Sequence, residues 1–413
     1  MPRFLQLHTL TSYPASLLNR DDVGFAKRIP FGGSERVRIS SQCLKRHWRR
    51  ADDEHALDRI EVDGERVPMS VRSRRTFEHH LFDPLVEEGV DAEVAQTVVS
   101  ELIDFVLPEG KAKQAAKAEA KAKAEGGEEE GARAELRTEQ VTVIGRPEVD
   151  YLLSLAREAA GEASSAKEAG EAVKKRLKEL RKNLEALADG IGPGAGLDAA
   201  LFGRMVTGDV LARCDAAVHV AHAFTVHPGA FETDYFSAVD DLQGPEETGS
   251  GHINTAELTS GLYYGYVVVD VPLLVSNLTG AQRTDWQSAD RALAGEVARR
   301  LVHLVTRVTP GAKLGSTAPY ARSLAVLAES GDSQPRTLAN AFLDGVPANG
   351  NGLLRGAYAA LARHLEEMDS MYGRDTARRL AAVEAPEELI ALADERTDLP
   401  NVAAWAAAQV QEG

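Results

Sequence analysis

The sequence predicts an α+β chain in which a helical region interrupts the strands. Residues 4–10 alternate between apolar and polar side chains, as in a half-buried strand. Residues 261–271 are apolar on both faces, which is typical of a central strand. Between these strands, residues 70–106 carry apolar side chains at helical spacing, and after the second strand residues 286–308 form another amphipathic pattern. Strands at both ends therefore enclose a largely helical segment.

A low-complexity stretch covers residues 108–135 of the helical region. It is rich in Ala, Lys, Glu and Gly and contains no Val, Ile, Leu or Phe. Such a segment cannot bury an apolar face, so we expect a solvent-exposed helix or a disordered spacer. Its lysines would also suit an RNA-binding arm, but the interspersed glutamates favour a neutral spacer.

Positive charge is concentrated in residues 19–50, which we name the basic island. It holds nine Lys or Arg and three acidic residues, a local balance of +6, whereas the whole chain carries −16. Binding responds to charge within roughly 8–10 Å, so a positive segment in an acidic protein indicates a local, negative partner. The overall charge argues against indiscriminate nucleic-acid binding.

Three features of the basic island are typical of phosphate-binding sites. A Gly-Gly turn at residues 32–33 has a backbone that can approach a ligand closely. Arg36 and Arg38 alternate with apolar residues, which predicts a short strand with both guanidinium groups on one solvent face. Ser40 is a typical helix cap, and the free N–H groups of a helix start attract anions.

The helix predicted after Ser40 turns Leu44 and Trp48 inward and leaves basic side chains to the side. These side chains are Lys45, Arg46, Arg49 and Arg50. Phosphate contacts of this kind give strong, salt-dependent binding. A solvated basic face explains the same pattern, and the residues alone leave the two interpretations evenly balanced.

Other features indicate a protein of the reducing cytosol. Cys43 and Cys214 lie far apart with no CxxC pair, so we expect free thiols and no zinc site. The histidines of residues 219–227 lack an acidic or cysteine partner, which favours polar core or surface roles. The start of the chain lacks a signal-peptide core, and the longest apolar run, residues 267–275, is too short for a bilayer. We expect a cytoplasmic protein with no membrane partner, cofactor or metal.

Three groups of residues, far apart in the chain, carry a family resemblance. The groups are residues 18–22, 31–33, 36–42 and 44–46; residues 203–205, 221–223, 236 and 238–242; and residues 310–313. In this order they closely resemble the Cascade backbone subunit (CasC type) of type I-E CRISPR surveillance complexes. The resemblance covers most of the chain outside residues 55–195, and the low-complexity stretch has no match in it.

The resemblance implies a modified RNA-recognition (ferredoxin-like) palm with an inserted helical finger and a β-hairpin thumb. The expected parts are palm at residues 1–56, 197–227 and 255–413, the last with C-terminal helices, finger at residues 57–196, and thumb at residues 228–254. The thumb segment is polar apart from aromatic residues such as Tyr235 and Phe236. This pair either folds back on the body or wedges between bases, and the resemblance favours the wedge.

The resemblance also implies partners and contacts. Copies of the chain would stack head to tail along one CRISPR RNA, present it to target DNA, and be capped by other Cascade subunits. The residues expected to hold the RNA are Arg20, Ser40, Gln42, Lys45, Arg46, Arg49, Arg204, Met205, Tyr235, Phe236 and Ser237. Those that could face target DNA are Lys27, Arg28 and Lys313. The tyrosines at 263, 264 and 266 could stack bases or pack in the core.

We expect no enzymatic activity, because the chain has no Walker loop, GxGxxG after a strand, HExxH or nucleophile elbow. Asp21 and Asp22 are more simply explained as ion-pair partners of the basic island. The alternative is a metal-dependent target-RNA ribonuclease using Asp234, since related type III backbone subunits cut with a thumb aspartate. A pure assembly protein that needs no nucleic acid is a third possibility.

Overall fold

The computed structural model describes residues 2–107, 133–177, 194–204, 214–238, 252–347 and 352–412. The side chains of residues 236–238 and 252–254 lie outside this description. Most of the low-complexity stretch also lies outside it, so its role as a spacer stays a prediction.

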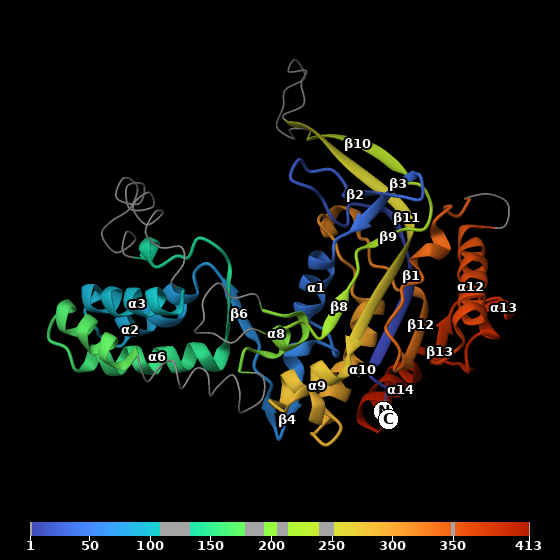
Figure 1. Ribbon diagram of the computed structural model, residues 1–413. Coiled ribbons are helices and arrows are strands. Elements are labelled where there is room, and N and C mark those ends of the chain that lie inside the picture. Colours follow the sequence, from blue (N-terminus) through green and yellow to red (C-terminus); the bar gives the residue numbers. More distant parts are fainter. Residues whose placement is uncertain are drawn as a thin grey trace, which may run out of the picture. The chain divides into compact units, whose positions relative to one another are not determined.

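The chain forms two compact units (Figure 1). The first comprises Met1–Leu57, Val218–Val271 and Arg291–Gly413, and the second comprises Asp58–Ala217 and Pro272–Asp290. The second unit thus includes a late segment that the sequence analysis did not associate with the helical insertion. The predicted palm, finger and thumb boundaries stay predictions.

A large mixed sheet is the framework of the first unit. Neighbouring strands run in the order β14-β13-β12-β1-β11-β9-β3-β2, and β8 and β10 also pair with β11. Their bounds are β1 (Phe4–Ser16), β2 (Arg28–Phe31), β3 (Ser34–Ile39), β8 (Val218–Val220), β9 (Ala223–Thr225), β10 (Phe231–Ala238), β11 (His252–Asp270), β12 (Ser323–Gly331), β13 (Ala377–Ala382) and β14 (Glu395–Arg396). Central β1 is antiparallel to both β11 and β12.

Helices and helical turns complete the first unit. They are α1 (Ser41–Arg49), α10 (Ala292–Arg307), α11 (Leu314–Thr317), η4 (Ala339–Phe342), α12 (Leu353–Tyr372), α13 (Glu387–Ile390) and α14 (Leu399–Gln411). The helix predicted from residue 286 begins later, at Ala292, and a 3-10 turn, η3 (Arg283–Asp285), precedes it.

The central strands are buried on both faces. Adjacent strand residues point to opposite faces, and Tyr263 and Tyr264 of β11 are both buried. Tyr263 packs in a cluster with Leu44 of α1, whereas Tyr264 packs in a cluster with Tyr358 of α12. Helices α1 and α12 therefore cover opposite faces of the sheet.

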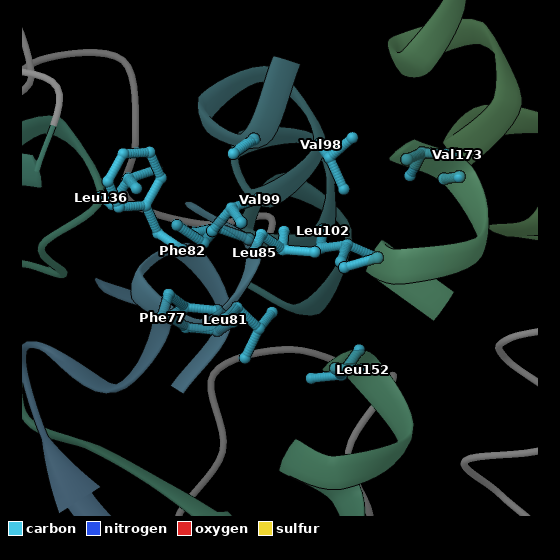
Figure 2. Packing of buried hydrophobic residues seen from close by; sticks show 14 of the residues in the cluster. Phe77, Leu81, Phe82, Leu85, Val98, Val99, Leu102, Leu136, Leu152 and Val173 are labelled. Carbon is cyan, nitrogen blue, oxygen red and sulfur yellow. The ribbon is translucent and has the colours of Figure 1, made fainter. Parts of the chain in front are cut away.

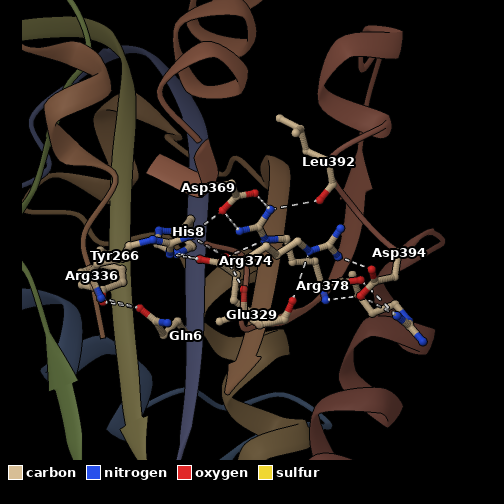
Figure 3. Close-up of polar contacts among 12 residues, drawn as sticks. Gln6, His8, Tyr266, Glu329, Arg336, Asp369, Arg374, Arg378, Leu392 and Asp394 are labelled. Atoms are coloured by element: carbon tan, nitrogen blue, oxygen red, sulfur yellow. Dashed lines mark hydrogen bonds and ion pairs between the residues drawn. The ribbon is translucent and has the colours of Figure 1, made fainter. Parts of the chain in front are cut away.

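His8 of β1 belongs to a buried polar network around Glu329. The His8 ring is buried, with Nε2 3.0 Å from Glu329 Oε2 on β12 and Nδ1 2.9 Å from the Tyr264 hydroxyl. Arg336 and Arg378 also bind Glu329, at 2.7 and 2.8 Å (Figure 3). Burial opposes ionisation of Glu329, but the hydrogen bonds from His8 and Arg336 hold its pKa well below its usual value. A buried carboxylate of this kind needs such partners.

The second unit has its own apolar core (Figure 2). Its elements are β4 (Glu61–Val62), β5 (Glu65–Arg66), β6 (Ser70–Ser73), η2 (Glu78–Phe82), α2 (Asp83–Glu87), α3 (Ala92–Val106), β7 (Thr142–Gly145), α6 (Arg146–Gly161), α8 (Leu197–Phe202) and η3; most of η1 (Leu57–Arg59) and of α9 (Val271–Thr279) also belongs to it. Five of the apolar side chains at helical spacing are buried, namely Phe77, Leu81, Leu85, Val98 and Leu102, and two, Val94 and Phe105, are partly buried against the same core. Residues 70–73, expected as helix, form β6 and pair with β7.

Candidate nucleic-acid interface

The start of α1 is capped as the sequence predicts. Ser40 has extended backbone geometry, and its Oγ accepts a hydrogen bond from the N–H of Cys43 at 3.3 Å. Ser40 itself is buried, so its hydroxyl is engaged in the cap. Gln42, by contrast, is exposed in the first turn. The helix start therefore offers backbone N–H groups and Gln42, while Ser40 maintains its geometry.

The loop at residues 20–27 presents cations around a backbone turn. Asp21 Oδ1 accepts hydrogen bonds from the N–H groups of Val23, Gly24 and Phe25 at 3.0, 2.8 and 2.9 Å. Asp21 thus stabilises the turn through backbone hydrogen bonds, whereas the sequence analysis expected it to form ion pairs with the basic island. Arg20 is exposed at one end of the loop.

Four cationic or titratable side chains gather around α1. Arg38 Nη1 lies 3.2 Å from His222 Nδ1. Burial lowers the pKa of His222, and the charges of Arg38 and Lys27 lower it further. Burial raises the pKa of Cys43 in α1, opposed by the charges of Arg46 and Lys27. We name Lys27, Arg38, Arg46 and His222 the α1 cluster.

His222 is the member of the α1 cluster that the sequence analysis did not select. It was treated as one of several histidines in polar core or surface positions. Its signal was present in the sequence, because it lies in the block at residues 221–223 that carries the resemblance. Only the pairing of β3 with β9, which joins Arg38 to Phe224, places it next to the basic island.

The segment at residues 310–313 lies beside α1 as well. The N–H of Gly311 donates to His47 Nε2 at 3.4 Å, and the N–H of Ala312 donates to the Leu17 carbonyl at 3.0 Å. These contacts bring half-buried Lys313 to the neighbourhood of α1, where Lys45 and Arg49 are also half-buried. Two distant blocks of the sequence therefore meet at one surface.

The structure differs from the expectations for the Gly-Gly turn and for Arg36. Arg36 is fully buried, and its Nη1 and Nη2 donate to the carbonyls of Thr225 and Phe342 at 3.2 and 3.1 Å. A Cβ on Gly32, whose φ is 58°, would lie 1.5 Å from the Leu343 carbonyl oxygen. The close backbone approach is therefore to the chain itself, and the expected solvent face for Arg36 is wrong.

Arg28 is engaged by two carboxylates. Its Nη2 donates to Glu257 Oε1 and Oε2 at 2.5 and 2.8 Å, and its Nη1 donates to Glu35 Oε1 at 3.1 Å. The guanidinium also lies over the Phe231 ring, 3.8 Å from its centroid. A residue predicted to face target DNA is thus held at the base of the β10–β11 hairpin.

The β10–β11 hairpin is regular over its described length. Its register runs from Phe231 opposite Thr259 to Ala238 opposite His252. The Tyr235 side chain is 62% exposed, so it does not fold back on the body. Phe236 and Ser237 belong to β10, but their side chains lie outside the description.

Comparisons with known proteins place the chain in a family. The model of the CT1975-like protein family matches residues 5–405. The chain belongs to the CT1975-like protein family. No curated protein matches it.

Two solved structures are similar to this CT1975-like chain over its whole length. A chain of a "CRISPR RNA-guided surveillance complex, pre-nicking" is 26% identical, with a TM-score of 0.76, and the match covers 98% of this chain and 100% of that one. A chain of a "CRISPR RNA-guided surveillance complex" is 21% identical, with a TM-score of 0.55, and the match covers 98% of both. The second likeness shows the fold alone. The predicted α+β fold class is confirmed.

In the second unit of the CT1975-like chain, Arg204 is buried. Its Nη1 and Nη2 donate to the carboxylate oxygens of Glu148 at 2.5 and 3.0 Å. Glu148 also accepts a hydrogen bond from the N–H of Gly145, so the pair holds the start of α6. The predicted contact of Arg204 with RNA stays a prediction and would require this pair to open. Met205 lies outside the described residues.

The tyrosines of β11 pack in the core of the CT1975-like chain. Tyr263 and Tyr264 are buried, and the partly buried Tyr266 donates its hydroxyl hydrogen to Gln6 Oε1 at 2.7 Å. Because Tyr263 and Tyr264 are each only 2% exposed, their rings present no open face for stacking a base.

Asp234 is exposed on β10. Within the described ranges, no group of three or more His, Cys, Asp or Glu side chains is arranged to hold a metal ion. Among the described helices, none combines the length and apolar character that crossing a membrane requires.

Proposed function

We propose that this chain is a CRISPR RNA-binding backbone subunit of a type I-E Cascade surveillance complex. The observation that carries the proposal is the α1 cluster, which brings Lys27, Arg38 and Arg46 together with His222 around the capped helix α1. The likeness at 26% identity to a chain of an RNA-guided surveillance complex supports the same function. A confined cationic surface in a chain of net charge −16 suits one bound RNA strand.

In this proposal the grip is made on RNA phosphates. Arg20 and Arg46 are exposed and reach the backbone, while the N–H groups at the start of α1 and Gln42 add hydrogen bonds. Phosphate contacts carry no sequence information, so any guide is accepted and base pairing supplies specificity. Lys45, Arg49 and Lys313 add positive charge around the same surface.

The exposed Tyr235 supports a role for the hairpin as a wedge between nucleotides. Aromatic side chains stack on bases without sequence preference, each for about 1–3 kcal/mol. Copies of the chain would then follow one RNA strand head to tail, an arrangement that forms an open filament unless other subunits cap it. Target DNA pairs with the displayed guide in the cytoplasm.

Alanine substitution of Arg20 or Arg46 tests the phosphate grip. Each variant should bind guide RNA more weakly, about equally for unrelated sequences, with a salt slope reduced by about one. Arg363→Ala is the matched control, because Arg363 is exposed on α12 and α12 covers the opposite sheet face. Binding is measured by fluorescence anisotropy across a salt series. A loss confined to one guide sequence would contradict the proposal.

The ribonuclease alternative has a direct test. Target RNA is incubated with the guide-loaded protein and Mg²⁺, alongside Asp234→Ala. We expect no cleavage by either protein. Cleavage that Asp234→Ala abolishes would establish the alternative.

The assembly alternative is tested by the ultraviolet absorbance ratio of the purified protein before and after ribonuclease treatment. The proposal expects bound nucleic acid in the oligomer and loss of the ordered oligomer after digestion. Ordered oligomers that form from guide-free protein and survive ribonuclease would favour assembly without nucleic acid.

A further inference from the structure

We propose that Arg28 is a positioning residue that fixes the base of the β10–β11 hairpin to β2 and β3, and that it makes no direct nucleic-acid contact. This inference rests on the proposed RNA-binding function and assigns Arg28, an arginine of the basic island, a structural role within it. Its structural part, the clamp on the hairpin, can be measured without RNA.

The first contact of the clamp is with β11. Glu257 is buried, and both of its carboxylate oxygens accept hydrogen bonds from the same Arg28 nitrogen, at 2.5 and 2.8 Å. A buried carboxylate without a cation is costly, so Glu257 requires Arg28 more than an exposed acid would. Charge-assisted hydrogen bonds of this kind are about twice as strong as neutral ones.

The second contact is with β10. The Arg28 guanidinium lies 3.8 Å from the centroid of the Phe231 ring, within the range of a cation–π interaction. Phe231 begins β10 and pairs with Thr259, while Glu257 pairs with Thr233 two residues further along the hairpin. One side chain therefore holds both strands of the hairpin near its base.

The third contact ties the clamp to the basic island. Arg28 Nη1 binds Glu35 of β3 at 3.1 Å, and the Glu35 carbonyl accepts the N–H of Gly229, just before β10, at 2.8 Å. The Arg28 carbonyl accepts Nε of Arg38, a member of the α1 cluster, at 3.0 Å. The hairpin base and the α1 cluster are thus linked through the backbone and side chain of one residue.

This arrangement gives the hairpin a fixed direction relative to the phosphate grip. If the clamp opens, Tyr235 loses its position while every phosphate-contacting cation remains. RNA affinity then falls without a change in the number of neutralised phosphates, so the salt slope stays the same. A direct phosphate contact by Arg28 would instead lower the slope by about one on removal.

Glu257→Gln separates the two interpretations by the sign of its effect. The substitution removes one negative charge, which by electrostatics alone strengthens binding to RNA. It also frees the Arg28 guanidinium, so a direct contact between Arg28 and RNA would strengthen binding further. The clamp predicts the opposite, a loss on the order of tenfold, comparable to that of Arg28→Ala.

The experiment measures binding of a CRISPR guide RNA to the full chain across a salt series. The variants are Arg28→Ala, Glu257→Gln and the double variant, with Glu232→Gln as the control. Glu232 is an exposed acid of β10, so the control makes the same charge change on the same hairpin. We expect both single variants to lose affinity at unchanged salt slope, the double variant to lose no more than either, and the control to keep wild-type affinity or exceed it.

Amide hydrogen exchange of the free protein provides the second readout. Exchange in β10 should quicken in Arg28→Ala and Glu257→Gln, whereas exchange in central β1 should stay at the wild-type rate, which shows that the sheet remains folded. Tighter RNA binding by Glu257→Gln, a lower salt slope for Arg28→Ala, or unchanged exchange in β10 would overturn the proposal. Wild-type protein that fails to bind RNA would refute the proposed function alone, and the exchange data would still decide the clamp.

Discussion

The side-chain oxygen of Asn19 accepts a hydrogen bond from the backbone N–H of Ser40 at 2.9 Å. The Asn19 carbonyl also accepts the N–H of Lys27, at 2.9 Å. One residue therefore joins both ends of the cation-bearing loop to the start of α1. The position of Arg20 relative to the helix start depends on this residue, which carries no charge.

Asn19→Ala should weaken guide binding at unchanged salt slope. The substitution removes one hydrogen bond, worth about 0.5–1.5 kcal/mol, and loosens the loop without removing a cation. We expect an affinity loss of roughly two- to tenfold in the anisotropy titration. Asn340→Ala, at an exposed position of η4, is the control and should bind as the wild type does. A reduced slope for Asn19→Ala would mean that the loop itself had lost a phosphate contact.

Guide binding should strengthen as the pH falls, through His222. In the free protein, burial and the charges of Arg38 and Lys27 keep the pKa of His222 below its ordinary value. A nearby phosphate raises that pKa, so RNA binding is coupled to uptake of a proton. The gain in affinity appears as the pH falls through the raised pKa of the bound protein, and it is complete below the lowered pKa of the free protein. His222→Gln should flatten the pH profile of affinity, whereas His364→Gln, on α12 across the sheet, should not. Identical profiles for wild type and His222→Gln would contradict this linkage.

Features set by local sequence were predictable, and those set by distant partners were not. The Ser40 cap and the apolar stripe of α1 depend on residues within one or two helical turns, and the structure reproduces both. Arg36 looked like a surface cation because its carbonyl partners, on Thr225 and Phe342, lie far along the chain. Alternation assigns a side chain to a face, but it cannot say what covers that face.

The α1 cluster also depends on partners that lie far apart in the sequence. The sequence identified Arg46 and Lys27 from charge density within one segment. It could not identify His222, which joins them only because β9 pairs with β3. The resemblance pointed to the block at residues 221–223, but only the strand pairing shows that His222 lies next to the basic island.

The first unit should lose stability as the pH falls from about 6.5 toward 4, in part through His303. Its ring stacks on that of His55, with centroids 3.7 Å apart, and both Nδ1 atoms lack a hydrogen-bond partner among the described residues. Burial, His55 and Arg307 lower the pKa of His303 to about 4. Between pH 6.5 and about 4, His303 is therefore protonated in the unfolded chain and largely neutral in the folded chain. The stability present above pH 6.5 is lost progressively as the pH falls to about 4.

His303→Phe tests this contribution, because phenylalanine keeps the ring stack and cannot be protonated. The thermal midpoint of the variant should fall less steeply than that of the wild type between pH 6.5 and 4. Parallel slopes for wild type and His303→Phe would show that His303 does not contribute to the pH dependence of stability.

Glu78→Gln should destabilise the second unit. Glu78 is buried at the start of η2, where Arg75 and Arg137 both bind its carboxylate, Arg137 Nε at 3.0 Å. Burial opposes its ionisation, but these two arginines lower its pKa to about 2. The substitution leaves both partners without their carboxylate, at a cost of about 1–3 kcal/mol, reduced by the partial exposure of the arginines.

The pH profile provides an independent check on Glu78. Its folded pKa lies below the unfolded value of 4.5, so its contribution is fully present above 4.5 and is lost as the pH falls toward about 2. Denaturant unfolding of the full chain, followed by exchange in α3, should show a lower midpoint for Glu78→Gln at pH 7 and a smaller difference from wild type near pH 2. Glu87→Gln, at an exposed position of α2, should match the wild type at both. An equal deficit at pH 7 and pH 2 would show that the loss arises from packing and that the ion pairs contribute nothing.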